Sequence, residues 1–200
     1  MAVPKTDLAV PERKRVVILF AETRGFTRTS EILEPSVVLE RVSEFFALVW
    51  AAVDRQEGRM RNVLNDTMAA SFAGDDSAKR AVTAAQEIQR EFVRFEEALE
   101  HSYGIRAAVA MGLHAGEAVV GSAGGIMQGQ PVIIGDSVSI AERLLHRARA
   151  GEYVLSKSVM DALASLGFPL EAEKLPPLEM PRREPIQLFG VLRDARLDFT

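Results

Sequence analysis

The groups available for chemistry in this 200-residue chain are mainly carboxylates and basic side chains, with 28 acidic and 24 basic residues. The chain has no cysteine, which excludes disulfide scaffolds, thiolate zinc sites and cysteine nucleophiles, and is compatible with a reducing cytosol. Its three histidines are far apart and form no HExxH-type pair, which argues against a histidine-rich metal site. Any chemistry should therefore depend on carboxylates and arginines.

Two carboxylates occupy places where a site could form. Glu22 ends the apolar run VVILFAE at residues 16–22, which is typical of a buried strand. Asp66 follows Asn65 between the strand-like runs MRNVL and TMAASF, and both residues tolerate the positive φ of a two-residue loop, so the sequence predicts a β-hairpin at 60–72. Taken alone, Glu22 and Asp66 could equally be surface carboxylates, and Asp66 could simply be a turn residue.

Three further features have plain structural interpretations. His114 lies in a predicted turn, His114-Ala115-Gly116, between two strands within residues 105–121, and no nucleophile or orienting acid stands near it in the sequence. The run GSAGGIMQG at 121–129 lacks the lysine of the GxxxxGK[ST] phosphate loop and is interpreted as a flexible connection. Arg143, near Arg147, could be a solvated helix residue.

Composition predicts one domain that binds neither nucleic acid nor membrane. The net charge is only −4, which removes a charge-based argument for nucleic-acid binding. Hydrophobic residues make up 48% of the chain, enough for a sizeable core, yet no apolar run approaches the roughly 18 residues that span a bilayer. Residues 1–15 contain no apolar h-region, so they are expected to be a flexible lead-in rather than a signal peptide or an anchor.

Hydrophobic spacing predicts how the remaining elements follow one another. Helices are expected at 35–53, from Ser77 to about residue 97, from Asp136 or Ser137 to 146, and at 157–166. Strands are expected at 131–136, buried, and at 153–155 and 185–192. This order predicts an α+β fold with a ferredoxin-like βαββαβ antiparallel sheet and helices on one face. We expect a single domain over residues 16–192 and a tail at 193–200.

Five segments in register resemble one known family. They are FAETRGFT (20–27), NDTMAASF (65–72), MGLHAGEAVVG (111–121), VIIGDSVSIAERL (132–144) and GEYVLSKSV (151–159). In this order and spacing they are similar to class III adenylyl/guanylyl cyclase catalytic domains over about residues 15–192, and the tail PPLEMPRREPIQLFGVL looks like that family's closing strand pair. The resemblance implies conversion of ATP or GTP to a cyclic 3′,5′-monophosphate with release of pyrophosphate, using two Mg²⁺ or Mn²⁺ ions.

Carrying the family's site over position by position shows several departures. The metal-binding aspartates fall at Glu22, whose stem is one methylene longer, and at Asp66, which is retained. The base-reading lysine falls at Asn62. Its partner, an aspartate or threonine in the family, falls at Val132, whose side chain cannot hydrogen-bond a base. The catalytic asparagine falls at Ser139.

The arginine that acts beside that asparagine, on the helix after the last core strand, is kept as Arg143, which would contact the phosphates. The resemblance also implies a head-to-tail dimer in which each chain completes the other's site, and it places the Gly-rich run near a dimer arm. A homodimer is expected, and a heterodimer with an intact cyclase could complement the missing groups. We therefore expect a cytoplasmic cyclase-homology domain with weak or no activity that binds nucleotide or regulates a partner. The alternative is an active adenylyl or guanylyl cyclase with unusual base recognition.

Overall fold

The computed structural model describes residues 11–64, 66–122 and 131–193. Within these ranges, β1 extends well beyond the predicted strand, and its first residues lie in the segment that we expected to be a lead-in. The elements are β1 (Glu12–Arg24), α1 (Phe26–Ile32), α2 (Pro35–Arg55), β2 (Arg59–Leu64), β3 (Thr67–Ala73), α3 (Ser77–Tyr103), β4 (Ala108–Ser122), β5 (Pro131–Ile134), α4 (Asp136–Arg147), β6 (Glu152–Ser156), α5 (Lys157–Ser165), β7 (Glu173–Leu178) and β8 (Ile186–Leu192).

The strands form one sheet in the order β2-β3-β1-β4-β6-β8-β7, with β5 attached to β4. The half β2-β3-β1-β4 is antiparallel and has the predicted ferredoxin-like order. The predicted α+β fold is therefore confirmed. Beyond this antiparallel half the sheet is mixed, because β4 and β6 run parallel. Such a pair needs a crossover, which α4 supplies.

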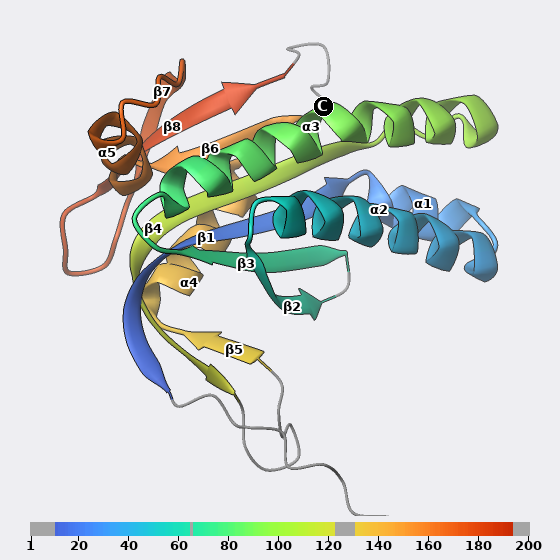
Figure 1. Cartoon of the computed structure of the whole chain (residues 1–200). Helices are drawn as coiled ribbons and strands as arrows, with labels where there is room; N and C mark the ends of the chain where they lie inside the picture. Colours follow the sequence, from blue (N-terminus) through green and yellow to red (C-terminus); the bar gives the residue numbers. More distant parts are fainter. Residues whose placement is uncertain (1–10, 65, 123–130, 194–200) are drawn as a thin grey trace, which may run out of the picture.

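Helices cover both faces of the sheet, so the expectation of helices on one face is also wrong. Alternate residues of β1 point to opposite sides, and Val17 and Leu19 pack in the core that includes α2, α3 and α5. Val16 and Ile18 pack instead in a second core, which α4 covers with its apolar stripe. Figure 1 shows α2 and α3 together on one side of the sheet and α4 on the other.

The largest difference from the sequence prediction is in β4. It is one continuous strand from Ala108 to Ser122, not two strands around a turn at His114-Ala115-Gly116. Its glycines serve close packing instead. A Cβ on Gly112 would lie 2.2 Å from the backbone nitrogen of Leu145, and one on Gly116 would lie 2.3 Å from Ser137 Oγ. These glycines let α4 sit directly on the strand.

Smaller differences concern ends and edges of elements. The helix α3 begins at Ser77 as predicted, but no side chain caps it. The strand β5 is not buried as predicted, since Ile134 is 65% exposed. The segment β7 is a strand despite Pro176 and Pro177, which an edge strand tolerates because one side of its backbone needs no partner. The Gly-rich run from residue 123 onward lies outside the described residues.

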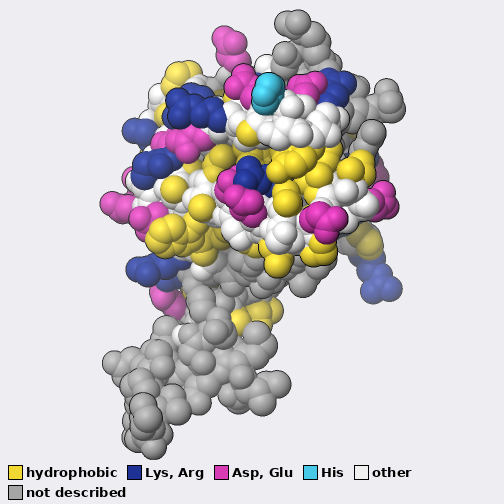
Figure 2. Space-filling view, turned by 90° about the vertical axis from the view of Figure 1, so that its right-hand side faces the viewer, with side chains coloured by type: hydrophobic (Ala, Val, Ile, Leu, Met, Phe, Trp, Pro, Cys, Tyr) yellow, Lys and Arg dark blue, Asp and Glu magenta, His cyan; other side chains and the backbone are white. Residues whose placement is uncertain are grey.

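The surface carries mixed charge and some exposed apolar side chains. Figure 2 looks at the side to which the right-hand ends of α2 and α3 point in Figure 1, where hydrophobic patches lie between acidic and basic groups. Leu39 and Trp50 of α2 are 69% and 56% exposed. In the described part of the chain, every helix is too short or too polar to cross a membrane.

Candidate functional site

Glu22 lies near the end of β1 on the face that α4 covers. Its register partner on the adjacent strand β3 is Thr67, the first residue of that strand. Thr67 Oγ1 donates a hydrogen bond of 3.3 Å to Glu22 Oε2, and Arg24 Nη1 donates to Glu22 Oε1. The Glu22 side chain is only 16% exposed. Both of its carboxylate oxygens are therefore occupied by donors from the same chain.

Asp66 is held next to Glu22 by the β2–β3 hairpin. It occupies the turn immediately before Thr67, and its carboxyl group is half-buried. Burial raises the pKa of this carboxyl, and the charge of Glu22 raises it further, whereas a backbone hydrogen bond and Arg24 lower it. The structure thus brings the two predicted metal-binding carboxylates into electrostatic contact at one end of the sheet. Asn65 lies outside the described residues.

The donor set around Glu22 and Asp66 suits a divalent cation in part. Carboxylate oxygens are the ligands that Mg²⁺ and Mn²⁺ prefer. The described residues contain no group of three or more His, Cys, Asp or Glu side chains that could hold a metal ion. A cation would therefore depend on these two carboxylates, and it would compete with Arg24 for Glu22.

The two predicted base-reading positions lie on strands that contact each other, β2 and β5. Asn62 pairs with Ala69 of β3, next to a register shift, and its side chain is not among those described. Val132 pairs with Gly121 and is half-buried. The structure thus brings these two strands together, as a shared base-binding wall would require, although Val132 offers such a wall only apolar contact.

The two predicted catalytic residues lie one turn apart on α4. Ser139 is exposed, and Arg143 is half-buried. Arg143 Nη2 donates to the Glu179 carbonyl oxygen at 2.9 Å, and its Nη1 lies 3.0 Å from Met180 Sδ. The guanidinium group is thus directed to the segment between β7 and β8 of its own chain. Arg24, the partner of Glu22, contacts the carbonyl oxygen of Leu145, two residues further along the same helix.

Strand β7 and the connection that follows it are tied to α4 at further points. Arg147 Nη2 donates to the Pro177 carbonyl oxygen at 3.3 Å, and Arg183 forms a two-bond ion pair with Asp136, with distances of 2.6 and 3.2 Å. Exposed pairs of this kind are individually weak. They nevertheless place the connection along the helix that carries Ser139 and Arg143.

His114 belongs to a buried hydrogen-bond chain, not to a turn. Its Nδ1 lies 2.9 Å from Ser156 Oγ, which lies 3.0 Å from Ser158 Oγ, and Ser158 donates to the Ala115 carbonyl oxygen at 2.7 Å. Because Ser158 donates its one hydrogen to Ala115, it must accept from Ser156, and Ser156 must then accept from His114. Neutral His114 is therefore protonated on Nδ1, and Nε2 would take up the next proton.

Acid is expected to destabilise the fold through His114. Burial lowers the pKa of His114 to about 4, while Asp136 raises it and Arg15 lowers it. The unfolded chain binds this proton near pH 6.5, so the free energy of unfolding should fall as the pH drops from about 6.5 to about 4, by up to about 3 kcal/mol. Urea unfolding at several pH values measures this change. The variant His114→Gln should lose less stability than the unmodified chain over this range, and equal losses would contradict the assignment.

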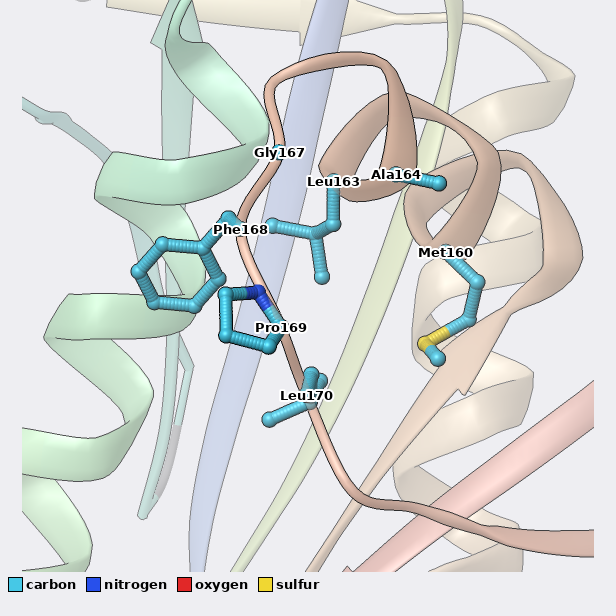
Figure 3. A pocket seen from close by; sticks show the side chains of 7 residues that line it. All are labelled: Met160, Leu163, Ala164, Gly167, Phe168, Pro169 and Leu170. Carbon is cyan, nitrogen blue, oxygen red and sulfur yellow. The ribbon is translucent and has the colours of Figure 1, made fainter.

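The described cavity near α5 does not contribute to the carboxylate site. It has a volume of about 370 Å³ and is lined by residues of α5 and of the segment that follows it. Figure 3 shows Met160, Leu163 and Ala164 on the helix and Phe168, Pro169 and Leu170 on the segment after it. None of the lining side chains can be ionised, so the cavity offers neither a metal ligand nor a phosphate-binding group.

Sequence reasoning missed two residues of the site, Arg24 and Thr67. Arg24 stands two positions after Glu22 on the same strand, and this spacing places both side chains on one face. That signal was available, but it does not show that Arg24 also reaches α4. Thr67 was hidden because its role depends on the register between β1 and β3.

Comparison with known proteins agrees with this architecture. The chain is 28% identical over 142 residues to an adenylate cyclase of Anabaena cylindrica, covering 69% of this chain and 28% of that protein. The adenylyl cyclase CyaB from P. aeruginosa superposes with a TM-score of 0.83 at 19% identity, over 94% of this chain and 98% of that structure.

The non-canonical dimeric guanylyl cyclase domain of the RhoGC fusion protein, from the fungus Blastocladiella emersonii, superposes with a TM-score of 0.78 at 18% identity. The match covers 90% of this chain and 98% of that structure. These likenesses to solved structures show the fold alone. The sequence model of the family described as adenylate and guanylate cyclase catalytic domain matches residues 8–191. The chain therefore belongs to the family of adenylate and guanylate cyclase catalytic domains.

Proposed function

We propose that this chain is a cyclase-homology domain with weak or no cyclase activity, which binds a nucleotide or regulates a partner in cyclic-nucleotide signalling. The observation that carries the proposal is the hydrogen bonding of Glu22, whose two carboxylate oxygens accept hydrogen bonds from Arg24 and Thr67. A carboxylate that an internal cation already neutralises is a poorer ligand for a second cation. A metal ion at this site would therefore compete with that ion pair.

Substitutions in the rest of the site support the same proposal. Val132 cannot hydrogen-bond a base, and Ser139 lacks the amide of the family's asparagine. Each preorganised polar contact to a transition state can be worth about 10²–10³ in rate. Losing several contacts at once should leave little turnover, even though Asp66 and Arg143 are retained.

Magnesium or manganese would be the metal if one binds. Glu22 and Asp66 would hold it, and a bound cation would supply charge for the ribose 3′-hydroxyl and the phosphates of ATP or GTP. Arg143 would have to leave Glu179 and Met180 to reach a phosphate. The chain's own contacts at Glu22 and at Arg143 thus favour the inactive arrangement.

A dimer is the proposed assembly, because the family's site implies groups from two chains. The RhoGC domain is also a dimer, of a non-canonical kind. A homodimer would carry the same substitutions in both of its sites. A heterodimer with an intact cyclase could combine Arg143 or the carboxylates of this chain with a complete set from the partner. We propose a cytoplasmic location, where ATP and GTP are available and a chain without cysteine needs no oxidising compartment.

A cyclase assay on the purified chain tests the proposal directly. The protein is incubated with ATP or GTP and Mn²⁺, and cyclic product is quantified by liquid chromatography. We expect little or no cyclic nucleotide, together with saturable nucleotide binding by calorimetry. Robust turnover would instead establish the alternative, an active cyclase with unusual base recognition. An absence of nucleotide binding would leave a partner-regulating role, which binding to an intact cyclase domain would test.

A further inference from the structure

Arg24 joins the carboxylate site to α4 through the two ends of one guanidinium group. Its Nη1 donates to Glu22 Oε1. Its Nη2 donates to the Leu145 carbonyl oxygen at 2.9 Å and, more weakly, to the Ala148 carbonyl oxygen at 3.4 Å. The side chain is 27% exposed, so water competes only in part for these bonds. One side chain therefore satisfies a carboxylate and a helix terminus at once.

The contact with α4 fixes where the positive charge sits. Leu145 lies in the last turn of α4, and Ala148 is its C-cap residue. The carbonyl oxygens of a helix C-terminus lack partners within the helix and carry partial negative charge, so a cation stabilises them. Arg24 is therefore anchored from the α4 side. Its charge should stay beside Glu22 and Asp66 even if the bond to Glu22 opens.

We propose that Arg24 is an internal counter-ion that competes with a divalent cation for Glu22 and connects the carboxylate pair to α4. This rests on the proposed function, because it assumes that Glu22 and Asp66 are the cation-binding groups of this domain. Arg24 would not touch a nucleotide. It is a positioning residue that sets the cation affinity of the site and holds the end of the helix carrying Arg143.

Charge and hydrogen bonding at Arg24 can be separated with two variants. Arg24→Gln removes the charge but keeps a donor for an α4 carbonyl oxygen, whereas Arg24→Lys keeps the charge but loses the forked geometry. Arg147→Gln is the matched control. It removes one positive charge from the last turn of α4, the turn that Arg24 contacts, but Arg147 contacts Pro177 instead of Glu22. Asp66→Asn shows whether binding requires the carboxylate pair.

Mn²⁺ binding to the purified chain, without nucleotide, is the measurement. Electron paramagnetic resonance of free Mn²⁺ gives the dissociation constant, and circular dichroism confirms that each variant is folded. We expect Arg24→Gln to bind Mn²⁺ about tenfold more tightly than the unmodified chain, because a unit charge beside the cation is gone. Arg24→Lys and Arg147→Gln should stay within about twofold of the unmodified chain, and Asp66→Asn should bind more weakly.

A purely structural role for Arg24 would give a different pattern. Both Arg24 variants would then loosen the last turn of α4, seen as faster amide hydrogen exchange, without any gain in Mn²⁺ affinity. That result, or an absence of Mn²⁺ binding by Arg24→Gln at millimolar Mn²⁺, overturns the inference. The proposed function fails separately, through robust cyclic product from the unmodified chain, and such turnover could accompany either result for Arg24.

Discussion

A variant that restores the family's residues at four positions is expected to convert ATP to cyclic AMP at least about a hundredfold faster than the unmodified chain. The substitutions are Glu22→Asp, Asn62→Lys, Val132→Asp and Ser139→Asn. The reason is the placement of these positions in the fold. The charge of Glu22 acts on Asp66, the strands β2 and β5 that carry Asn62 and Val132 contact each other, and Ser139 is exposed one turn before Arg143. Cyclic AMP measured by mass spectrometry gives the rates.

The control is the same restored variant with Arg143→Ala. Removing this arginine should reverse most of the gain in rate if its guanidinium group contacts the phosphates. Such a group raises the rate by orders of magnitude only when the rest of the site is assembled. Equal turnover by the restored and the unmodified chains, both folded, would mean that something other than these four residues limits the site. The ion pair between Arg24 and Glu22 would be the next candidate.

Gly112→Ala is expected to cost about 3 kcal/mol or more in the free energy of unfolding, the upper range for overpacking a core. A Cβ at this position would lie 2.2 Å from the Leu145 nitrogen and 2.4 Å from the Ala141 oxygen. Both are backbone atoms of α4, so no side chain can rotate away and the whole helix must shift. Urea denaturation measures the loss.

Gly167→Ala is the matched control for Gly112→Ala. This glycine has φ of 63° and nothing within 4 Å of an added Cβ. Gly167→Ala should therefore lower the free energy of unfolding only by the cost of a left-handed alanine, about 1–2 kcal/mol. If Gly112→Ala is no less stable than Gly167→Ala, then α4 does not rest on β4 as closely as described. A shifted α4 should also weaken the contact between Arg24 and Leu145.

Much of the fold could be predicted because its hydrophobic patterns are regular. The helix from Pro35 and the helix from Asp136 each show apolar residues at three- and four-residue intervals, and both begin where predicted. The hairpin around Asp66 could be predicted from its turn residues. The strand β4 could not, because Gly116 suggests a turn in a sequence when its actual role, close contact with Ser137, depends on a helix that follows later.

The site could be predicted in part and for a similar reason. Glu22, Asp66 and Arg143 were assigned by register with a family, and the structure brings the two carboxylates together. The hydrogen bonds that these side chains form within the folded chain could not be predicted from the sequence. Arg24 meets Leu145, and Arg143 meets Glu179, only after the chain has folded. Sequence patterns record periodicity along one element, whereas these bonds join elements that are distant in the sequence.

The central position of β1 has a consequence for synthesis. This apolar strand lies between β3 and β4, and its last residue, Arg24, pairs with Ala108. During translation β1 therefore leaves the ribosome long before β4 has been synthesised, and such long-range pairing is intrinsically slow. Until β4 emerges, the nascent chain can offer β1 only the β3 edge, and its other edge remains open to wrong partners. Chaperone demand during translation should thus be concentrated on the first half of this domain.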